Sequence, residues 1–193
     1  AKRLGARVQA FDTRPVVAEQ VQSLGGKFVE IDLGETGQTK DGYAQELTPE
    51  QLELQRLGMK DVISDSDIVI TTAQLFGRPA PRIVTADMVA AMKKGGVIVD
   101  MAVDSGGNVE GSKPDETVDI NGVSIIGVAN LPAHVSSDAS QMYSSNLYNL
   151  VSEYWDEESK TFNLDLDDDI LKGCVITHDG SLVNDAIKNI RGS

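Results

Sequence analysis

The sequence predicts an α/β protein built on a doubly wound parallel sheet. Strand-like and helix-like segments alternate through residues 1–135, and this alternation is typical of parallel strands joined by crossover helices. The expected strands are rich in Val and Ile and almost continuously hydrophobic, as strands covered on both faces should be. They are residues 7–11, 27–31, 67–71, 97–101 and 124–128.

Helix start and stop signals lie between these strands. Pro15 begins the first helix, and Gly25-Gly26 ends it. Thr48-Pro49-Glu50 begins a longer helix, and Thr85 is the expected N-cap of a third, which ends at Gly95-Gly96. The apolar residues expected on the inner sides of these helices are Val17, Val21, Leu24, Leu52, Met59, Ile63, Met88, Val89 and Met92.

The strand–helix alternation stops near Ser136. Residues 140–153 are expected to form one helix, and the acidic run 165–169 is expected to be a solvated face. The dipeptide Asp179-Gly180 predicts the turn of a hairpin between residues 174–177 and 181–183.

The predicted domain organisation follows from this change of pattern. Residues 1–135 are expected to form a Rossmann-type domain truncated at its N-terminus. Residues 136–190 are expected to form a C-terminal helix and hairpin that belong to a second lobe, and residues 191–193 are compatible with a tag remnant.

The composition excludes several classes of function. The chain has 193 residues, of which 40% are hydrophobic, enough for one domain of ordinary size or a domain with a small appendage. A net charge of −13 argues against nucleic acid as a partner and disfavours an anionic membrane surface. Cys174 is the only cysteine, so no intramolecular disulfide can form, and His134 and His178 lack the spacing of a structural metal site. No apolar run approaches the roughly 18 residues of a membrane span.

Asp12 is the strongest candidate site residue. It ends the short apolar strand Val8-Gln9-Ala10-Phe11, as the acid that holds an adenosine ribose does in a dinucleotide-binding sheet. The other reading is an ordinary acid that closes a strand and caps the next helix. The usual Gly-x-Gly-x-x-Gly turn lies about 20 residues before such an acid. Only eleven residues precede Asp12, so we expect that turn and the first strand to lie outside this chain.

Further candidates follow other expected strands, where parallel sheets bind ligands. Thr13 and Arg14 follow Asp12, and Arg14 either meets a phosphate or adenine or is simply solvated. Small residues in the segment that includes Thr72, Ala73 and Gly77 would let a dinucleotide lie against backbone amides; a Pro-rich loop without a ligand is the alternative.

The next strand ends in a second group of candidates. Asp104 could face a nicotinamide or an organic substrate, whereas Asp100 is expected to be an acid bound to nearby backbone. Gly106-Gly107 indicates positive φ angles or a close backbone approach. Tyr43 lies in a long polar loop, which is either a mobile lid over a nucleotide or a surface insertion.

Several segments together resemble the alanine dehydrogenase/pyridine nucleotide transhydrogenase family. The likeness runs in register along nearly the whole chain. Its segments include Phe11-Asp12-Thr13-Arg14-Pro15, Asp41-Gly42-Tyr43-Ala44, Thr71-Thr72-Ala73, Gly77-Arg78-Pro79-Ala80-Pro81 and Val97-Ile98-Val99-Asp100-Met101-Ala102. Within the family, the chain is most similar to the NAD(H)-binding alpha subunit of proton-translocating transhydrogenases.

This resemblance implies a function and a set of partners. It implies NAD as the cofactor, hydride exchange with NADP(H) on a partner domain, and coupling to proton movement through a membrane-spanning domain. It also implies a homodimer and a peripheral position on the cytoplasmic face of the inner membrane. Asp12 matches the ribose-binding acid and Tyr43 the aromatic residue of a mobile loop, while the segments around Thr72, Gly77 and Asn130 match loops that border the nucleotide.

The chain also departs from the family pattern. The Gly-rich turn and the first-lobe loop that arranges the nicotinamide have no counterpart in it. We therefore expect the sheet to lack a central strand and to expose two edges. We also expect this chain alone to bind NAD weakly or not at all and to be inactive.

Two rival readings remain open from the sequence. One is an NAD-dependent alanine dehydrogenase, in which Asp104 would occupy the position of a catalytic acid. The other is an assembly fragment that packs, as a swapped dimer for example, and binds no nucleotide.

Overall fold

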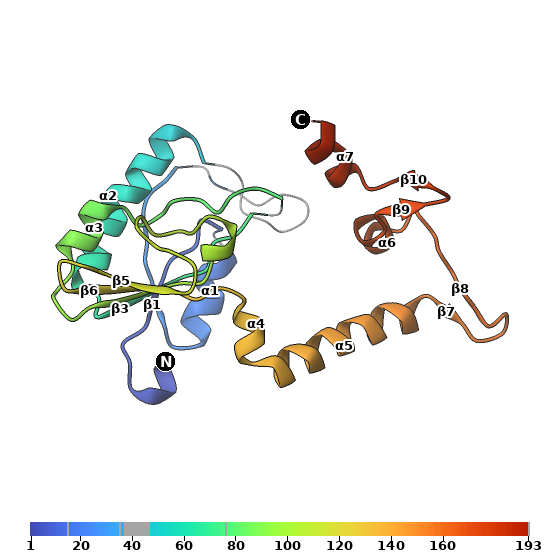
Figure 1. Ribbon diagram of the computed structural model, residues 1–193, viewed down its shortest axis with the longest axis horizontal. Coiled ribbons are helices and arrows are strands. Elements are labelled where there is room, and N and C mark those ends of the chain that lie inside the picture. Colours follow the sequence, from blue (N-terminus) through green and yellow to red (C-terminus); the bar gives the residue numbers. More distant parts are fainter. Residues whose placement is uncertain (15, 35, 37–46, 76, 193) are drawn as a thin grey trace. The chain divides into compact units, whose positions relative to one another are not determined.

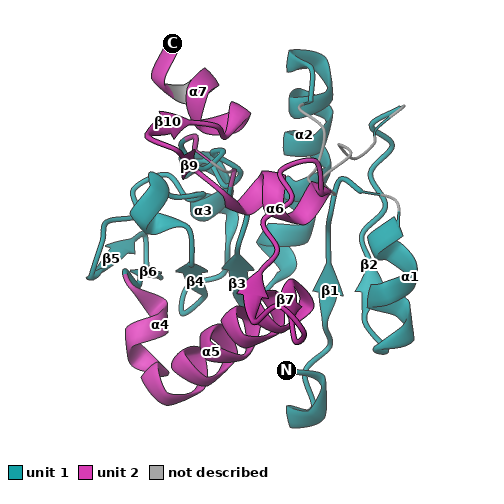
Figure 2. Ribbon diagram, turned by 90° about the vertical axis from the view of Figure 1, so that its right-hand side faces the viewer, with its two compact units in different colours: residues 1–74, 79–129 teal, residues 75–78, 130–193 magenta. Residues whose placement is uncertain are grey.

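A computed structural model describes residues 1–14, 16–34, 36, 47–75 and 77–192. Tyr43 and Pro15, which the sequence singles out, lie outside the described residues. Contacts within the chain divide it into two compact units. One consists of Ala1–Gln74 and Pro79–Ala129, and the other of Leu75–Arg78 and Asn130–Ser193 (Figure 2).

The first unit contains the parallel strands that the sequence predicts, arranged in two sheets. Strands β1 and β2 pair in one sheet, and the other has the order β3-β4-β6-β5. The arrows of β1, β2, β3 and β4 point the same way in Figure 2. The strands are β1 (Gln9–Ala10), β2 (Lys27–Phe28), β3 (Ile68–Thr71), β4 (Val97–Asp100), β5 (Glu116–Ile120) and β6 (Val123–Gly127).

Without the edge strand β5, the orders β2-β1 and β3-β4-β6 match the two parts of a six-stranded Rossmann sheet that lie on either side of its first strand. Among the described strands, β1 and β3 do not pair with each other, as the expectation of two exposed edges requires. Strand β5 was not expected, and it pairs antiparallel with β6 as an edge strand. Its sequence Glu116-Thr117-Val118-Asp119-Ile120 lacks the continuous hydrophobicity of its neighbours because none of its residues is buried.

Helices of the first unit begin close to the predicted positions. They are α1 (Val16–Ser23), α2 (Pro49–Asp65) and α3 (Ala86–Ala91), with 3₁₀ turns at Lys2–Leu4 and Val103–Ser105. Thr48 and Gln51 form a reciprocal capping box at the start of α2. Thr85 is the N-cap residue of α3 by position, but its side chain makes no capping bond and donates to Asp87 instead. The third predicted helix also ends earlier than expected, at Ala91.

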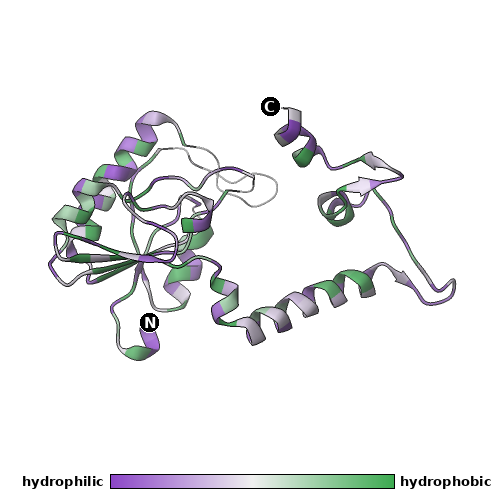
Figure 3. Cartoon of the chain, in the orientation of Figure 1, coloured by the Kyte–Doolittle hydropathy of each residue, from purple (hydrophilic) through white to green (hydrophobic). Residues whose placement is uncertain are grey.

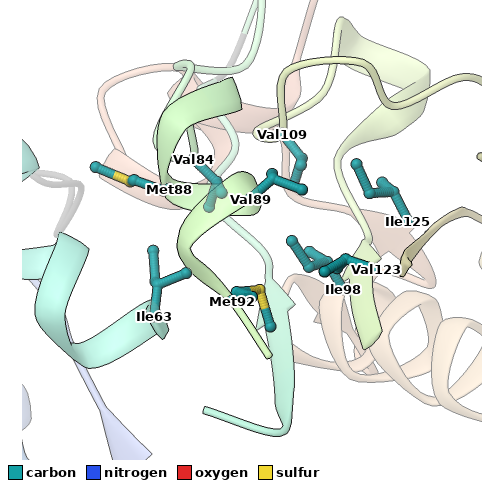
Figure 4. Packing of buried hydrophobic residues seen from close by; sticks show 9 residues of the cluster. All are labelled: Ile63, Val84, Met88, Val89, Met92, Ile98, Val109, Val123 and Ile125. Carbon is teal, nitrogen blue, oxygen red and sulfur yellow. The ribbon is translucent and has the colours of Figure 1, made fainter. Parts of the chain in front are cut away.

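The hydrophobic core lies between the four-stranded sheet and the pair α2 and α3 (Figures 1 and 4). Fully buried side chains of this kind each contribute about 1.5–3 kcal/mol to folding. Helix α2 carries hydrophilic as well as hydrophobic residues, as a helix with one solvated side does (Figure 3). The core residues are Ile63, Val84, Met88, Val89, Met92, Ile98, Val109, Val123 and Ile125.

Several predictions about burial are wrong. The opposite face of β3 is not covered as expected, because Ile68 and Ile70 are 65% and 59% exposed. Leu24 is 80% exposed, because α1 ends at Ser23 and Leu24 falls in the turn that follows. In the predicted stripe of α2, Ile63 is only 1% exposed as expected, whereas Leu52 is 50% exposed and contradicts the prediction.

The second unit contains the long helix and the hairpin that the sequence predicts. Asp179 and Gly180 both have positive φ angles, 47° and 73°, as the two central residues of a type I′ hairpin turn require. Its elements are α4 (Leu131–His134), α5 (Ser136–Glu153), β7 (Trp155–Asp156), β8 (Thr161–Phe162), α6 (Asp169–Cys174), β9 (Thr177–His178), β10 (Ser181–Leu182) and α7 (Asp185–Gly192).

The acidic run 165–169 is not simply a solvated face. Asp168 is the N-cap of α6 and accepts bonds from the amides of Ile170 and Leu171 at 2.9 and 3.0 Å. It also accepts a 2.6 Å hydrogen bond from the hydroxyl of Tyr154. A carboxylate suits this position because it meets the unpaired amides and the positive end of the helix dipole.

Candidate functional site

The register of the larger sheet brings the ends of its strands to one edge. Thr71 of β3 pairs with Asp100 of β4, which pairs with Gly127 of β6. The residues that follow these strands therefore start at the same level along the sheet. Thr72 and Ala73 follow β3, and Asp104 follows β4 within the 3₁₀ turn Val103–Ser105.

Asp12 follows β1 and is bound to Arg14. The Oδ1 atom of Asp12 accepts bonds from the backbone amide and Nε of Arg14, at 2.8 and 2.9 Å, and Oδ2 accepts one from Nη2 at 2.8 Å. Partial burial raises the pKa of Asp12, but the bonds and charge of Arg14 outweigh that effect and hold the pKa below its ordinary value. The carboxylate is therefore ionised and fixed in orientation.

The Asp12–Arg14 pair accommodates both readings of this acid. The bond from the Arg14 amide closes a local turn, as expected if Asp12 only closes the strand and caps the next helix. A carboxylate offers about four acceptor positions, and Arg14 fills three of them. The Asp12 side chain is 25% exposed, so a ligand hydroxyl can reach the carboxylate.

The acid at the end of β4 organises its own loop. Asp100 is fully buried, and its Oδ1 accepts bonds from the amides of Ala102 and Asn108 at 3.0 and 3.2 Å. Its Oδ2 accepts a bond from the Val109 amide at 3.1 Å, and the Thr71 hydroxyl lies 3.5 Å from Oδ1. The prediction that Asp100 binds nearby backbone is confirmed.

Two glycines in this loop have the predicted backbone conformation. Gly106 and Gly107 have φ angles of 105° and 78°, a region that residues with a side chain rarely adopt. Gly107 is buried and Gly106 is exposed. The turn they make returns the chain toward the segment after β3, where the Ala80 amide donates to the Ser105 carbonyl at 2.7 Å.

Sequence reasoning missed Asn108, which is fully buried. Its side chain bonds to the amide and carbonyl of Ala73 and to the carbonyl of Pro81. Its main partner Ala73 lies 35 positions away in the sequence, so no local pattern marks this residue.

The remaining predicted site residues differ in exposure and in the unit to which they belong. Thr72 and Asp104 are exposed and Thr13 is half-buried. Gly77 and Asn130 belong to the second unit, where both are exposed and have positive φ angles of 68° and 47°. Asn130 is the N-cap residue of α4.

Metal-ligating side chains do not gather in the described part of the chain. Within it, no group of three or more His, Cys, Asp and Glu side chains is placed to hold a metal ion. The helices described here include none with the length and apolar character needed to cross a membrane.

The order and parallel direction of the strands define a Rossmann-like α/β domain. Over residues 1–185 the chain matches the family model described as alanine dehydrogenase/PNT, C-terminal domain. The chain belongs to this family.

The relatives divide into two groups. An NAD(P) transhydrogenase alpha subunit from Rhodospirillum rubrum is 42% identical over 189 residues, 97% of this chain and 49% of the relative. The corresponding alpha subunit of Cereibacter sphaeroides is 40% identical, over 94% of this chain and 35% of the relative. An alanine dehydrogenase from Halomonas elongata is 32% identical over 69% of this chain and 37% of that protein.

Solved structures give the same ranking. A transhydrogenase from Sinorhizobium meliloti has a TM-score of 0.70 and 38% identity over 94% of this chain and 47% of that one. An L-alanine dehydrogenase has a TM-score of 0.63 and 25% identity over 99% of this chain and 48% of the other. The comparisons thus favour transhydrogenase relatives over alanine dehydrogenases. This chain spans about half the length of the Rhodospirillum relative.

Proposed function

We propose that this chain is the NAD(H)-binding part of a proton-translocating NAD(P) transhydrogenase. The full protein would pass hydride between NAD(H) and NADP(H) on a partner domain. Relatives named as transhydrogenase alpha subunits, 40–43% identical over almost the whole chain, support this function. The observation that carries the proposal is the position of the partly exposed Asp12 carboxylate at the end of a parallel strand.

Asp12 would select NAD(H) over NADP(H). An ionised carboxylate accepts hydrogen bonds from ribose hydroxyls and repels a 2′-phosphate. Because Arg14 lowers the pKa of Asp12, this carboxylate is charged at neutral pH. Arg14 and Thr13 would border the adenosine, with Arg14 holding the acid in place.

The loops after β3 and β4 would line the rest of the site. Exposed Thr72 and half-buried Ala73 leave room for a ligand beside the backbone. Asp104 is exposed in the loop that follows the neighbouring strand β4. We assign Gly77, Asn130 and Tyr43 to the same nucleotide site on the resemblance alone.

No side chain of this chain needs to act as acid or base in that reaction. The bound nicotinamide supplies the hydride chemistry, so the protein's task is to position it and to exclude water. This division of labour explains why binding residues rather than catalytic residues are proposed.

The partners follow from the same proposal. The chain would work with an NADP(H)-binding domain and a membrane-spanning domain, as a homodimer on the cytoplasmic face of the inner membrane. Its charge of −13 does not suit nucleic acid.

The proposal is tested by titrating the full-length protein with NADH. We expect the Asp12→Asn variant to raise the Kd for NADH by about tenfold or more, because hydrogen bonds to a charged acceptor contribute roughly 1.5–3 kcal/mol. Asp61→Asn is the matched control, since it removes the same charge from an exposed position of α2. Equal affinity of wild type and Asp12→Asn would contradict the ribose-binding role.

A separate activity assay distinguishes a transhydrogenase from an alanine dehydrogenase. The full-length protein with its partner domains should reduce NADP⁺ with NADH and should not aminate pyruvate. Pyruvate amination would instead support an alanine dehydrogenase, in which the exposed Asp104 has the role of an acid.

A further inference from the structure

We propose that Asn108 is a positioning residue that holds Ala73 and Pro81, the two stems of the loop after β3, in the arrangement that receives the dinucleotide. The inference rests on the proposed function, because it concerns the same edge of the sheet. Asn108 itself is fully buried, so it would act through the residues it bonds rather than by touching a ligand.

The side chain of Asn108 joins both stems of that loop. Its Nδ2 donates to the carbonyl of Ala73 at 2.9 Å and to the carbonyl of Pro81 at 2.8 Å. Its Oδ1 accepts a bond from the Ala73 amide at 3.0 Å. One amide group therefore fixes the separation between residue 73, where the chain leaves β3, and residue 81, where it returns.

The backbone of Asn108 is fixed from two further directions. Its amide donates to Asp100 at 3.2 Å, which ties it to the end of β4. Its carbonyl accepts bonds from the amides of Ile83 and Val84 at 2.8 and 2.9 Å. Asn108 thus transmits the rigid position of the sheet to Ala73, one of the residues proposed to lie beside the nucleotide.

The chemistry of these contacts requires an asparagine. An amide offers two donors and an acceptor in one small plane, and the contacts use both kinds. Aspartate has the same shape but would place a second oxygen against two carbonyl groups. Alanine would leave the Ala73 amide and both carbonyls without their partner, and unpaired buried groups of this kind are costly.

A loop held in this way binds its ligand without first having to be ordered. Ordering a loop on binding reduces affinity. Because Asn108 fixes Ala73 and Pro81 before the ligand arrives, its loss should raise the Kd and KM for NADH. It should leave kcat at saturation little changed, because no reacting group is removed.

The test uses Asn108→Ala and Asn108→Asp in the full-length protein. We expect each to raise the Kd and KM for NADH by about tenfold, with kcat and the KM for NADP⁺ within about twofold of wild type. Hydrogen exchange at the Ala73 amide should become faster in both variants, with or without NADH, because that amide loses its acceptor or its fixed geometry.

Val123→Ala is the control for a purely structural effect. Val123 is buried in the core at the opposite end of β6, so its truncation lowers stability without touching the loop. It should leave the Kd for NADH unchanged.

The possible results separate the positioning role from the proposed function. Wild-type affinity in both Asn108 variants, or an equal loss of affinity in Val123→Ala, would overturn the positioning role. Failure of the wild-type protein itself to bind NADH is a different result, because it overturns the proposed function before any variant is compared.

Discussion

A Cβ atom on Gly107 would lie 2.7 Å from Oδ2 of Asp100, closer than Cβ atoms in proteins come to non-bonded neighbours. The glycine therefore lets the loop fold tightly over the buried carboxylate. Because Oδ2 accepts the Val109 amide, pushing Asp100 aside would break that bond as well.

We expect Gly107→Ala to destabilise the protein more than Gly95→Ala. Both glycines have positive φ angles, 78° and 87°, but a Cβ on Gly95 would meet nothing within 4 Å. Backbone strain alone costs of order 1–3 kcal/mol, and Gly107→Ala adds the contact with Asp100. Urea denaturation of both variants measures the difference. Equal free energies of unfolding would show that Asp100 moves aside at no cost.

The capping box of α2 gives a second prediction. Thr48→Ala should lower the free energy of unfolding by about 1 kcal/mol, because the Thr48 hydroxyl accepts the Gln51 amide. Thr85→Ala is the comparison, since Thr85 occupies the same position in α3 without a capping bond. A loss for Thr85→Ala as large as that for Thr48→Ala would contradict this assignment.

The pair of Asp12 and Arg14 predicts a pH dependence. The pKa of Asp12 is lower in the folded protein than its ordinary 3.8, so its contribution to stability is present above that value. The contribution is lost as the pH falls through the folded pKa. In Arg14→Gln, NMR titration of the carboxyl carbon should give a higher pKa for Asp12, and acid unfolding should begin at a higher pH. An unchanged pKa would mean that Arg14 does not hold this carboxylate.

Tyr154 predicts a change at the alkaline end. The bond to Asp168 raises the pKa of Tyr154 to about 12. Its stabilising effect is therefore present below the ordinary tyrosine pKa of 10.0 and lost as the pH rises through about 12. Absorbance titration should show a late-ionising phenol that disappears in Tyr154→Phe.

The Tyr154→Phe variant preserves the aromatic contact of residue 154. Tyr154→Phe keeps the contact with Phe162, whose ring centroid lies 6.1 Å away, so it removes the hydroxyl alone. If Asp168→Asn left the late ionisation in place, a different tyrosine would be responsible for it.

Local signals in the sequence predicted much of this fold. The cap at Thr48 and the turn at Asp179-Gly180 depend on neighbouring residues, and both are confirmed. The buried role of Asp100 could also be predicted, because the glycines that bring amides to it are close in sequence.

Features that depend on distant residues could not be predicted in the same way. Asn108 meets Ala73 from 35 positions away, and no short pattern records that pairing. The edge strand β5 mixes polar and apolar residues, so its own sequence does not indicate a strand. It is a strand because it pairs with β6. The sequence does not distinguish Asp168 from its acidic neighbours. In the structure Asp168 differs from them because it accepts bonds from two backbone amides at the start of α6.

The uncovered side of β3 has a practical consequence for handling this polypeptide. Ile68 and Ile70 present aliphatic surface on a strand whose neighbour β1 does not pair with it. Such strands recruit other extended chains and promote aggregation. Preparations of this polypeptide by itself should therefore precipitate as its concentration rises. The variants Ile68→Lys and Ile70→Lys should stay in solution at the same concentrations.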